Sequence, residues 1–130
     1  MSEPAWVDAE DLIEFNRLTV EETGEPHLLL HRDLLESSVD RPRQNLHFGE
    51  VEDVVVLGCL LACSIAQNHP FQQGNKRTAQ AALFRFLWIN DYTFRDPDDP
   101  ELAELLIAMI EHRISEEEYT DAIDRHVVER

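Results

Sequence analysis

Lysine is nearly absent from this sequence of 130 residues. Lys76 is the only one, and lysine and arginine together number 11 against 27 aspartates and glutamates. The resulting formal net charge of −16 would repel phosphate backbones over the whole surface, which argues against a nucleic-acid-binding protein that relies on cations for affinity. Any site for an anion must therefore be local.

The sequence also lacks a long apolar run and a secretory signal. Its longest apolar stretch, 54–66, is well short of the roughly 20 residues that span a bilayer, and residues 1–12 have neither a basic start nor an apolar middle. We therefore expect a cytoplasmic protein without membrane contact. Its two cysteines, Cys59 and Cys63, should be reduced, and because no further ligand is evident near them we interpret both as core residues.

Hydrophobic residues make up 43% of the chain, which is enough for a core, so a single domain over residues 1–130 is expected. Asp8 or Asp11 can cap a first helix that ends at Gly24, and a short helix over 31–39 follows. Segment 40–48 should differ from these helices. It contains Pro42, which disfavours helical geometry at the preceding residue, and is therefore predicted to be extended or a hairpin.

Two buried helices are predicted over 51–66 and 78–90, because apolar residues occupy nearly all of their faces. A further helix is expected over 101–112, and Ser115 begins a capping box for a last helix that continues to Val128. No alternating strand pattern is evident. The predicted fold class is therefore all-α, with about six helices and at most one small hairpin.

The polar turn between the two buried helices, NHPFQQGNKRTA at 68–79, has the composition of an anion site. Gly74 allows close approach to the backbone, and free amides at the start of the following helix attract negative charge. Lys76 adds a point charge, and Arg77 adds a fork that matches phosphate oxygens. Together with Asn75, these residues predict a phosphate cradle.

His69 stands directly before this cradle. A histidine at this place could accept the proton of an attacking hydroxyl. Phe71 is expected to anchor the loop in the core, and Asn75 could orient a phosphate oxygen, cap the helix, or do both. Each residue taken singly also has an ordinary explanation in a solvated loop or a helix start, and only the combination indicates a site.

The combination resembles the Fic/Doc family, whose loop carries His-x-Phe-x-acid-Gly/Ala-Asn-x-Arg between two core helices. The matching residues are His69, Phe71, Gly74, Asn75 and Arg77, and such a set rarely arises by chance in one window. The resemblance extends over about 7–128 and is strongest to the death-on-curing (Doc) branch. It implies a Fic/Doc-type helical bundle of about six helices with a small β-hairpin flap.

Most proteins of this family transfer AMP from ATP to a hydroxyl of a target protein, whereas the Doc branch transfers the γ-phosphate. The Doc branch has lysine after the motif asparagine, as Lys76 is here. The resemblance therefore favours a kinase-type phosphotransferase that uses ATP and Mg²⁺, with AMP transfer as the alternative. It implies that His69 is the base, that Gly74 and Asn75 hold phosphate, and that Lys76 and Arg77 neutralise it.

Doc-branch proteins act as the toxin of a toxin–antitoxin pair and modify a translation elongation GTPase. The resemblance thus implies a cognate antitoxin and a target of this kind as partners. The self-inhibiting motif of the family, Ser/Thr-x-x-x-Glu, is absent from the sequence, so inhibition is expected from a separate antitoxin. The target-docking flap would lie in 41–48, where a target strand could add to a hairpin edge, and would include Arg41, Pro42, Arg43, Gln44 and Asn45.

One position departs from the family pattern. Gln73 stands where the family has the acid that holds Mg²⁺. An amide oxygen can ligate Mg²⁺ but brings no negative charge, so Gln73 is only a weak candidate for a metal ligand. Three outcomes follow: a slower kinase whose metal is held mainly by ATP, a different donor, or a catalytically impaired Fic/Doc fold that works as a binding module.

Overall fold

The computed structural model describes residues 3–49 and 51–130, which form six α-helices and two short strands. This confirms the all-α class with about six helices. The single domain predicted over 1–130 includes Met1, Ser2 and Glu50, which lie outside the described residues. The helices are α1 (Ala9–Thr23), α2 (Arg32–Phe48), α3 (Val54–Asn68), α4 (Asn75–Ile89), α5 (Glu101–Ile110) and α6 (Glu116–Asp124), and the strands are β1 (Tyr92–Phe94) and β2 (Val127–Glu129).

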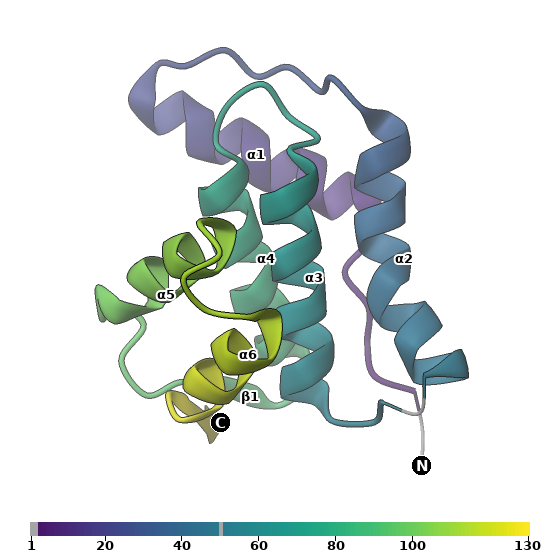
Figure 1. Cartoon of the computed structure of the whole chain (residues 1–130). Coiled ribbons are helices and arrows are strands. Elements are labelled where there is room, and N and C mark those ends of the chain that lie inside the picture. Colours follow the sequence, from purple (N-terminus) through teal and green to yellow (C-terminus); the bar gives the residue numbers. More distant parts are fainter. Residues whose placement is uncertain (1–2, 50) are drawn as a thin grey trace.

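Helix α3 occupies the centre of the bundle (Figure 1). It contacts α2, α4, α5 and α6, while α1 packs across α4. Most of its residues are buried, as the sequence predicted from an apolar stretch with almost no polar face. Because every neighbouring helix packs against it, α3 aligns the two ends of the loop that leads into α4.

The first helix begins and ends as its sequence predicts. The Asp8 side chain accepts a hydrogen bond from the Asp11 amide, and the Asp11 side chain accepts one from the Asp8 amide, which forms a capping box. At the other end, Gly24 adopts a left-handed conformation with φ 73° and terminates the helix. These caps fix where the connection to α2 leaves α1.

The region predicted as an extended flap is helical, so that prediction is wrong. Helix α2 continues to Phe48, with Pro42 inside it, and the flap residues Arg41, Pro42, Arg43, Gln44 and Asn45 all belong to the helix. The physical reason is a stripe at helical spacing that is buried on the bundle: Leu35, Ser38, Val39 and Pro42. Burial of this stripe outweighs the helix bond that proline removes. A helix offers no free strand edge, so strand addition cannot occur along this segment.

The end of the chain also differs from the prediction. The last helix ends at Asp124 instead of continuing to Val128, and β2 pairs antiparallel with β1, with Phe94 opposite Val127. Two adjacent valines favour an extended backbone, and buried Phe94 gives the pair an apolar anchor. The small two-stranded antiparallel element expected for this fold is therefore present, but it pairs 92–94 with 127–129 and does not lie in the segment 41–48.

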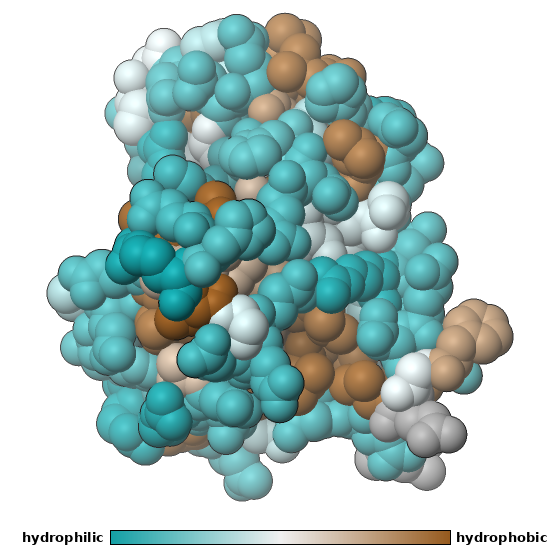
Figure 2. All heavy atoms as spheres, viewed as in Figure 1, coloured by the Kyte–Doolittle hydropathy of each residue, from teal (hydrophilic) through white to brown (hydrophobic). Residues whose placement is uncertain are grey.

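The surface is mostly hydrophilic on the face drawn in Figure 2, with apolar surface between α2 and α3. A groove of about 400 Å³ lies there, lined by Arg41, Val56, Leu60, Glu116, Glu117, Thr120 and Asp121. Among the described residues, no helix has the length and apolar character needed to cross a membrane.

Helices α3 and α4 approach closely at Gly58. A Cβ atom placed there would lie 3.0 Å from both Leu83 Cδ1 and Phe86 Cδ1, which is tighter than ordinary side-chain contact. We expect Gly58→Val to lower the free energy of unfolding by about 1–3 kcal/mol through overpacking, measured by urea denaturation. Gly58→Ala is the control and should cost less, because alanine favours the helix by about 1 kcal/mol. A valine variant as stable as the wild type would contradict this close packing.

The two cysteines are buried in α3, as predicted for core residues. Burial raises the pKa of the Cys59 thiol to about 12, and burial likewise raises the pKa of Cys63. Both thiols should therefore stay protonated and unreactive toward a thiol reagent at pH 8 in the folded protein, and react fully in urea. Fast labelling of either cysteine without urea would show that α3 opens locally.

Candidate functional site

Two connections meet at one end of the bundle (Figure 1). The α3–α4 loop lies beneath the connection that joins α1 to α2, and the two share a cavity of about 280 Å³. The structure thus brings together all the cradle residues that the sequence predicted, with one acidic residue from the second connection. The lining residues are Glu25, His69, Gln72, Gln73, Gly74, Asn75, Lys76 and Arg77.

His69 ends α3 in a left-handed conformation, with φ 48° and ψ 58°. This region is uncommon for a residue with a side chain, and such strain concentrates at functional sites. The conformation turns the chain out of α3, and the exposed imidazole lines the cavity. Pro70 and Phe71 follow at once and are buried, so the histidine is fixed from both sides.

Asn75 holds the loop closed. Its side-chain oxygen accepts a hydrogen bond from the Phe71 amide at 3.0 Å, and its side-chain nitrogen donates to the Phe71 carbonyl at 2.8 Å. Asn75 is 8% exposed and Phe71 is 1% exposed, so this pair lies in the protein interior. The Asn75 side chain is therefore occupied by the backbone, and its backbone amide is the group left to meet a ligand.

Gly74 precedes α4 with φ 77°, a conformation that glycine adopts without strain. A Cβ atom here would lie 3.0 Å from Val20 Cγ1 and 3.2 Å from Asn16 Nδ2, so α1 backs the loop closely. The first helical hydrogen bond of α4 runs from the Thr78 amide to the Gly74 carbonyl. Among the described residues, no side chain caps this end, which leaves the first-turn amides open to an anion.

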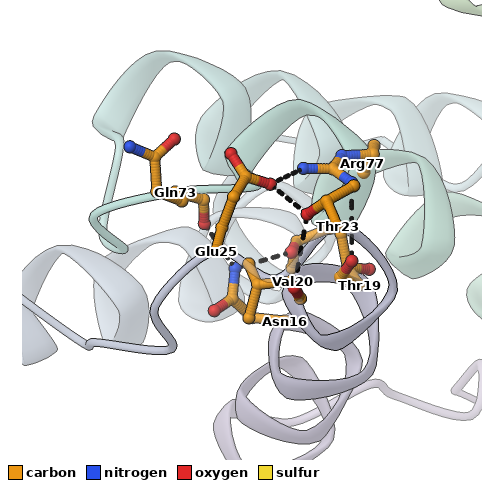
Figure 3. A network of polar contacts seen from close by, with 8 residues as sticks. Asn16, Thr19, Val20, Thr23, Glu25, Gln73 and Arg77 are labelled. Atoms are coloured by element: carbon orange, nitrogen blue, oxygen red, sulfur yellow. Dashed lines mark hydrogen bonds and ion pairs between the residues drawn. The ribbon is translucent and has the colours of Figure 1, made fainter.

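Asn16 of α1 positions the loop from below. It is fully buried, and its amide nitrogen donates to the Gln73 carbonyl at 2.8 Å and to the Thr78 hydroxyl at 3.1 Å. Its oxygen lies 2.8 Å from His27 Nδ1. The hydrogen bond from Asn16 holds the Gln73 backbone in place. Figure 3 shows the Gln73 side chain directed away from Asn16, on the same side of the loop as the Glu25 carboxylate.

Arg77 and Lys76 differ in their partners. Arg77 lies 2.5 Å from Glu25 Oε1 and donates to the Thr19 carbonyl at 3.4 Å (Figure 3). Lys76 is exposed and forms no ion pair in the part of the chain that the structure describes. The hydrogen bond from Thr23, followed by that from Arg77, lowers the pKa of the Glu25 carboxyl below its ordinary value of 4.5. Glu25 is therefore ionised at neutral pH.

An extended segment borders the loop beside His69. The amides of Leu30 and His31 donate to the Pro70 carbonyl at 2.9 and 3.0 Å, and the Gln72 amide donates to the Leu28 carbonyl at 2.9 Å. Leu28 and Leu30 are each about half exposed. The sequence predicted extended or hairpin structure at 40–48, which is helical, whereas the structure has an extended segment at 28–31, next to the candidate base.

The predicted flap residues lie elsewhere. Arg41 donates to the Ser64 hydroxyl and pairs with Glu116 at 2.7 Å, while Arg43 stacks over the Trp6 ring at 5.4 Å. None of the predicted flap residues lines the cavity that holds His69.

A second group of possible metal ligands comprises Asp99, Glu101 and His126, whose ligand atoms lie within 4.8 Å of one another. His126 Nε2 lies 3.1 Å from Glu101 Oε2, which ties the end of the chain to α5. Asp99 accepts a hydrogen bond from the Glu101 amide at the start of α5, so its carboxylate already serves the backbone there. We therefore assign this group a structural role.

The sequence model of the Fic/DOC family matches residues 6–87, which is more than half of the chain. The chain belongs to the Fic/DOC family. The match includes α1, the extended segment and the whole candidate cavity, and ends within α4. Among curated proteins, none matches the sequence.

Two residues of this Fic/DOC site were not predicted from the sequence. Asn16 interrupts the apolar positions Leu12 and Val20 at helical spacing, and a polar residue on a buried helix face is a signal for a specific hydrogen bond. Glu25 follows the end of α1 among other acidic residues, and nothing in its neighbourhood separates it from a solvated carboxylate. Only the fold places it against Arg77.

The two hydrogen bonds of Asn75 lead to a test of loop stability. Asn75→Ala leaves the buried Phe71 amide and carbonyl unpaired, so the free energy of unfolding should fall by about 1–3 kcal/mol, measured by urea denaturation. Asn75→Asp keeps an acceptor for the Phe71 amide but sets a carboxylate oxygen against the buried Phe71 carbonyl, so it should also lose stability. If alanine and aspartate variants were both as stable as the wild type, the clamp would not hold the loop.

Proposed function

We propose that this Fic/DOC protein transfers phosphate from ATP to a hydroxyl of a target protein. The proposal rests on one observation: the His69 imidazole lines the same cavity as the open N-terminus of α4, with Lys76 and Arg77 beside it. A base and a phosphate-binding helix start are thereby held in one small space. This juxtaposition suits a group transfer that begins with proton removal from a hydroxyl.

The predicted base and cradle residues each have a role in this reaction. His69 accepts the proton of the target hydroxyl, and the backbone amides at Gly74 and Asn75 hold a phosphate group. Lys76 and Arg77 neutralise its oxygens. The Asn75 side chain acts as a positioning group, because it closes the loop through Phe71. Lys76 is free of ion pairs among the described residues, which supports its direct use in binding phosphate. The preference for phosphate transfer over AMP transfer rests on the likeness of Lys76 to the lysine that the Doc branch has after the motif asparagine.

The donor groups in the cavity fit the phosphates of ATP together with a divalent cation. Two cationic side chains and the α4 amides match phosphate oxygens, while the Glu25 carboxylate and the Gln73 amide supply hard oxygen ligands at its border. A bound Mg²⁺ would neutralise phosphate charge during transfer. Gln73 alone offers weak support for the metal, because its amide carries no charge.

The target would dock beside His69. The extended segment 28–31 supports this, because it is hydrogen-bonded to the loop and exposes Leu28 and Leu30. A target strand could align along its outer edge and present a hydroxyl to the histidine. By its likeness to the Doc branch, we propose that the target is a translation elongation GTPase, that the protein is the cytoplasmic toxin of a toxin–antitoxin pair, and that a cognate antitoxin restrains it.

The test is a mass measurement on purified proteins. Incubation with ATP, Mg²⁺ and an elongation GTPase should add the mass of one phosphate to the GTPase. His69→Ala should slow this at least about 100-fold, because a positioned base contributes 10²–10⁴-fold to such a step. His112→Ala is a matched control, since His112 is exposed and lies outside the cavity, and it should leave the rate unchanged.

Other products would change the assignment. An added AMP would show the nucleotidyl transfer used by other family members. No added mass from the natural protein, together with activity in Gln73→Asp, would identify a binding module that has lost its metal ligand.

A further inference from the structure

The cavity contains a carboxylate that the loop sequence does not supply. Position 73 of the loop holds a glutamine, yet the residues that line the cavity include Glu25, which arrives from the connection after α1. It is the single acidic side chain among those lining residues. Mg²⁺ prefers a carboxylate together with phosphate oxygens, so Glu25 is the best metal ligand that the described part of this cavity offers.

The fold holds Glu25 in a defined place. Gly24 turns the chain at the end of α1, and the Glu25 amide donates to the Val20 carbonyl at 3.1 Å. The side chain is then directed to the loop by Thr23 and Arg77 (Figure 3). The backbone and the side chain are therefore both fixed before any ligand arrives.

Both side-chain contacts of Glu25 use the same oxygen. Thr23 Oγ1 and Arg77 donate to Oε1, and in the described part of the chain Oε2 has no hydrogen-bond partner. Figure 3 shows this second oxygen directed away from Thr23 and Arg77, on the side where the Gln73 amide stands. One oxygen of an ionised carboxylate is thus available at the border of the phosphate cradle.

We propose that Glu25 supplies the carboxylate through which this site holds a divalent cation with the phosphates of ATP, in place of the acid missing at position 73. The proposal rests on the function proposed above. Gln73 contributes at most a neutral amide oxygen beside it. The metal ligand has thus moved from the loop to the connection that packs against the loop.

Metal binding should depend on nucleotide. In the free protein, the Arg77 guanidinium lies 2.5 Å from the Glu25 carboxylate and repels a cation. Phosphate oxygens that engage Arg77 weaken its hold on Glu25 and bring their own negative charge, so nucleotide and cation each strengthen the binding of the other. The protein alone should bind the cation weakly.

The experiment measures Mn²⁺ binding by electron paramagnetic resonance, with adenylyl imidodiphosphate as the nucleotide. The complex of the wild-type protein with this nucleotide should bind Mn²⁺ more tightly than the free nucleotide does. Glu25→Gln should weaken the Mn²⁺ affinity of the protein–nucleotide complex at least about tenfold, whereas Glu22→Gln should not. Glu22 is the matched control, because it is an exposed glutamate at the same end of α1 and does not line the cavity.

A rescue variant separates ligation from structure. Adding Gln73→Glu to Glu25→Gln should restore tight Mn²⁺ binding, because it returns the carboxylate to the loop. Circular dichroism melting establishes that each variant is folded. If Glu25→Gln leaves Mn²⁺ affinity unchanged, the proposal is overturned. It is equally overturned if this variant binds the metal-free nucleotide more tightly without losing Mn²⁺ affinity, since Glu25 would then be a competitor of phosphate.

Failure of the proposed function gives a different result. A wild-type protein that binds no nucleotide by calorimetry, with or without Mn²⁺, would overturn both the phosphate-transfer function and the role of Glu25. A wild type that binds nucleotide and Mn²⁺ but responds only to Gln73→Ala would overturn the role of Glu25 alone.

Discussion

The side-chain amide of Asn75 forms two buried hydrogen bonds with the backbone of Phe71, and the site depends on this pair of bonds. It closes the loop over four residues and fixes where α4 begins, which in turn sets the direction of the open amides. It also holds Phe71 in the core, so that His69 emerges at a strained turn facing the same cavity. Asn16 then locks the loop against α1 through the Gln73 carbonyl. The buried Asn75 side chain thus positions the ligand-binding groups of the site without binding the ligand itself.

The sequence was informative where local chemistry decides the structure. The caps at Asp8 and Gly24, the buried character of α3, and the gathering of the loop residues around His69 all follow from spacing and residue type. These features depend on neighbours in the chain. The loop needed no distant partner to be recognised as an anion site, because a glycine, an open helix start and two cations are contiguous.

The misplaced features depend on contacts between distant residues. Pro42 is a local signal against helix, but burial of the stripe that contains it outweighs that signal. The segment 28–31 has no alternating pattern, and it becomes extended because its backbone bonds to Pro70 and Gln72. Glu25 could not be assigned to the site for the same reason, since its partner Arg77 is 52 residues away. Contacts between residues far apart in the chain are the features that are hardest to predict from a single sequence.

Helix α3 lies at the centre of the bundle, so a fragment of this chain that folds needs the helices that cover α3. The family match ends at residue 87, yet α5 and α6 cover α3 on faces that the matched segment leaves bare, with Leu106, Met109, Tyr119 and Ile123 in the core. A fragment trimmed to the matched residues would expose this apolar surface and be prone to aggregate. The last third of the chain therefore supplies apolar cover for α3, while the loop supplies the groups of the candidate site.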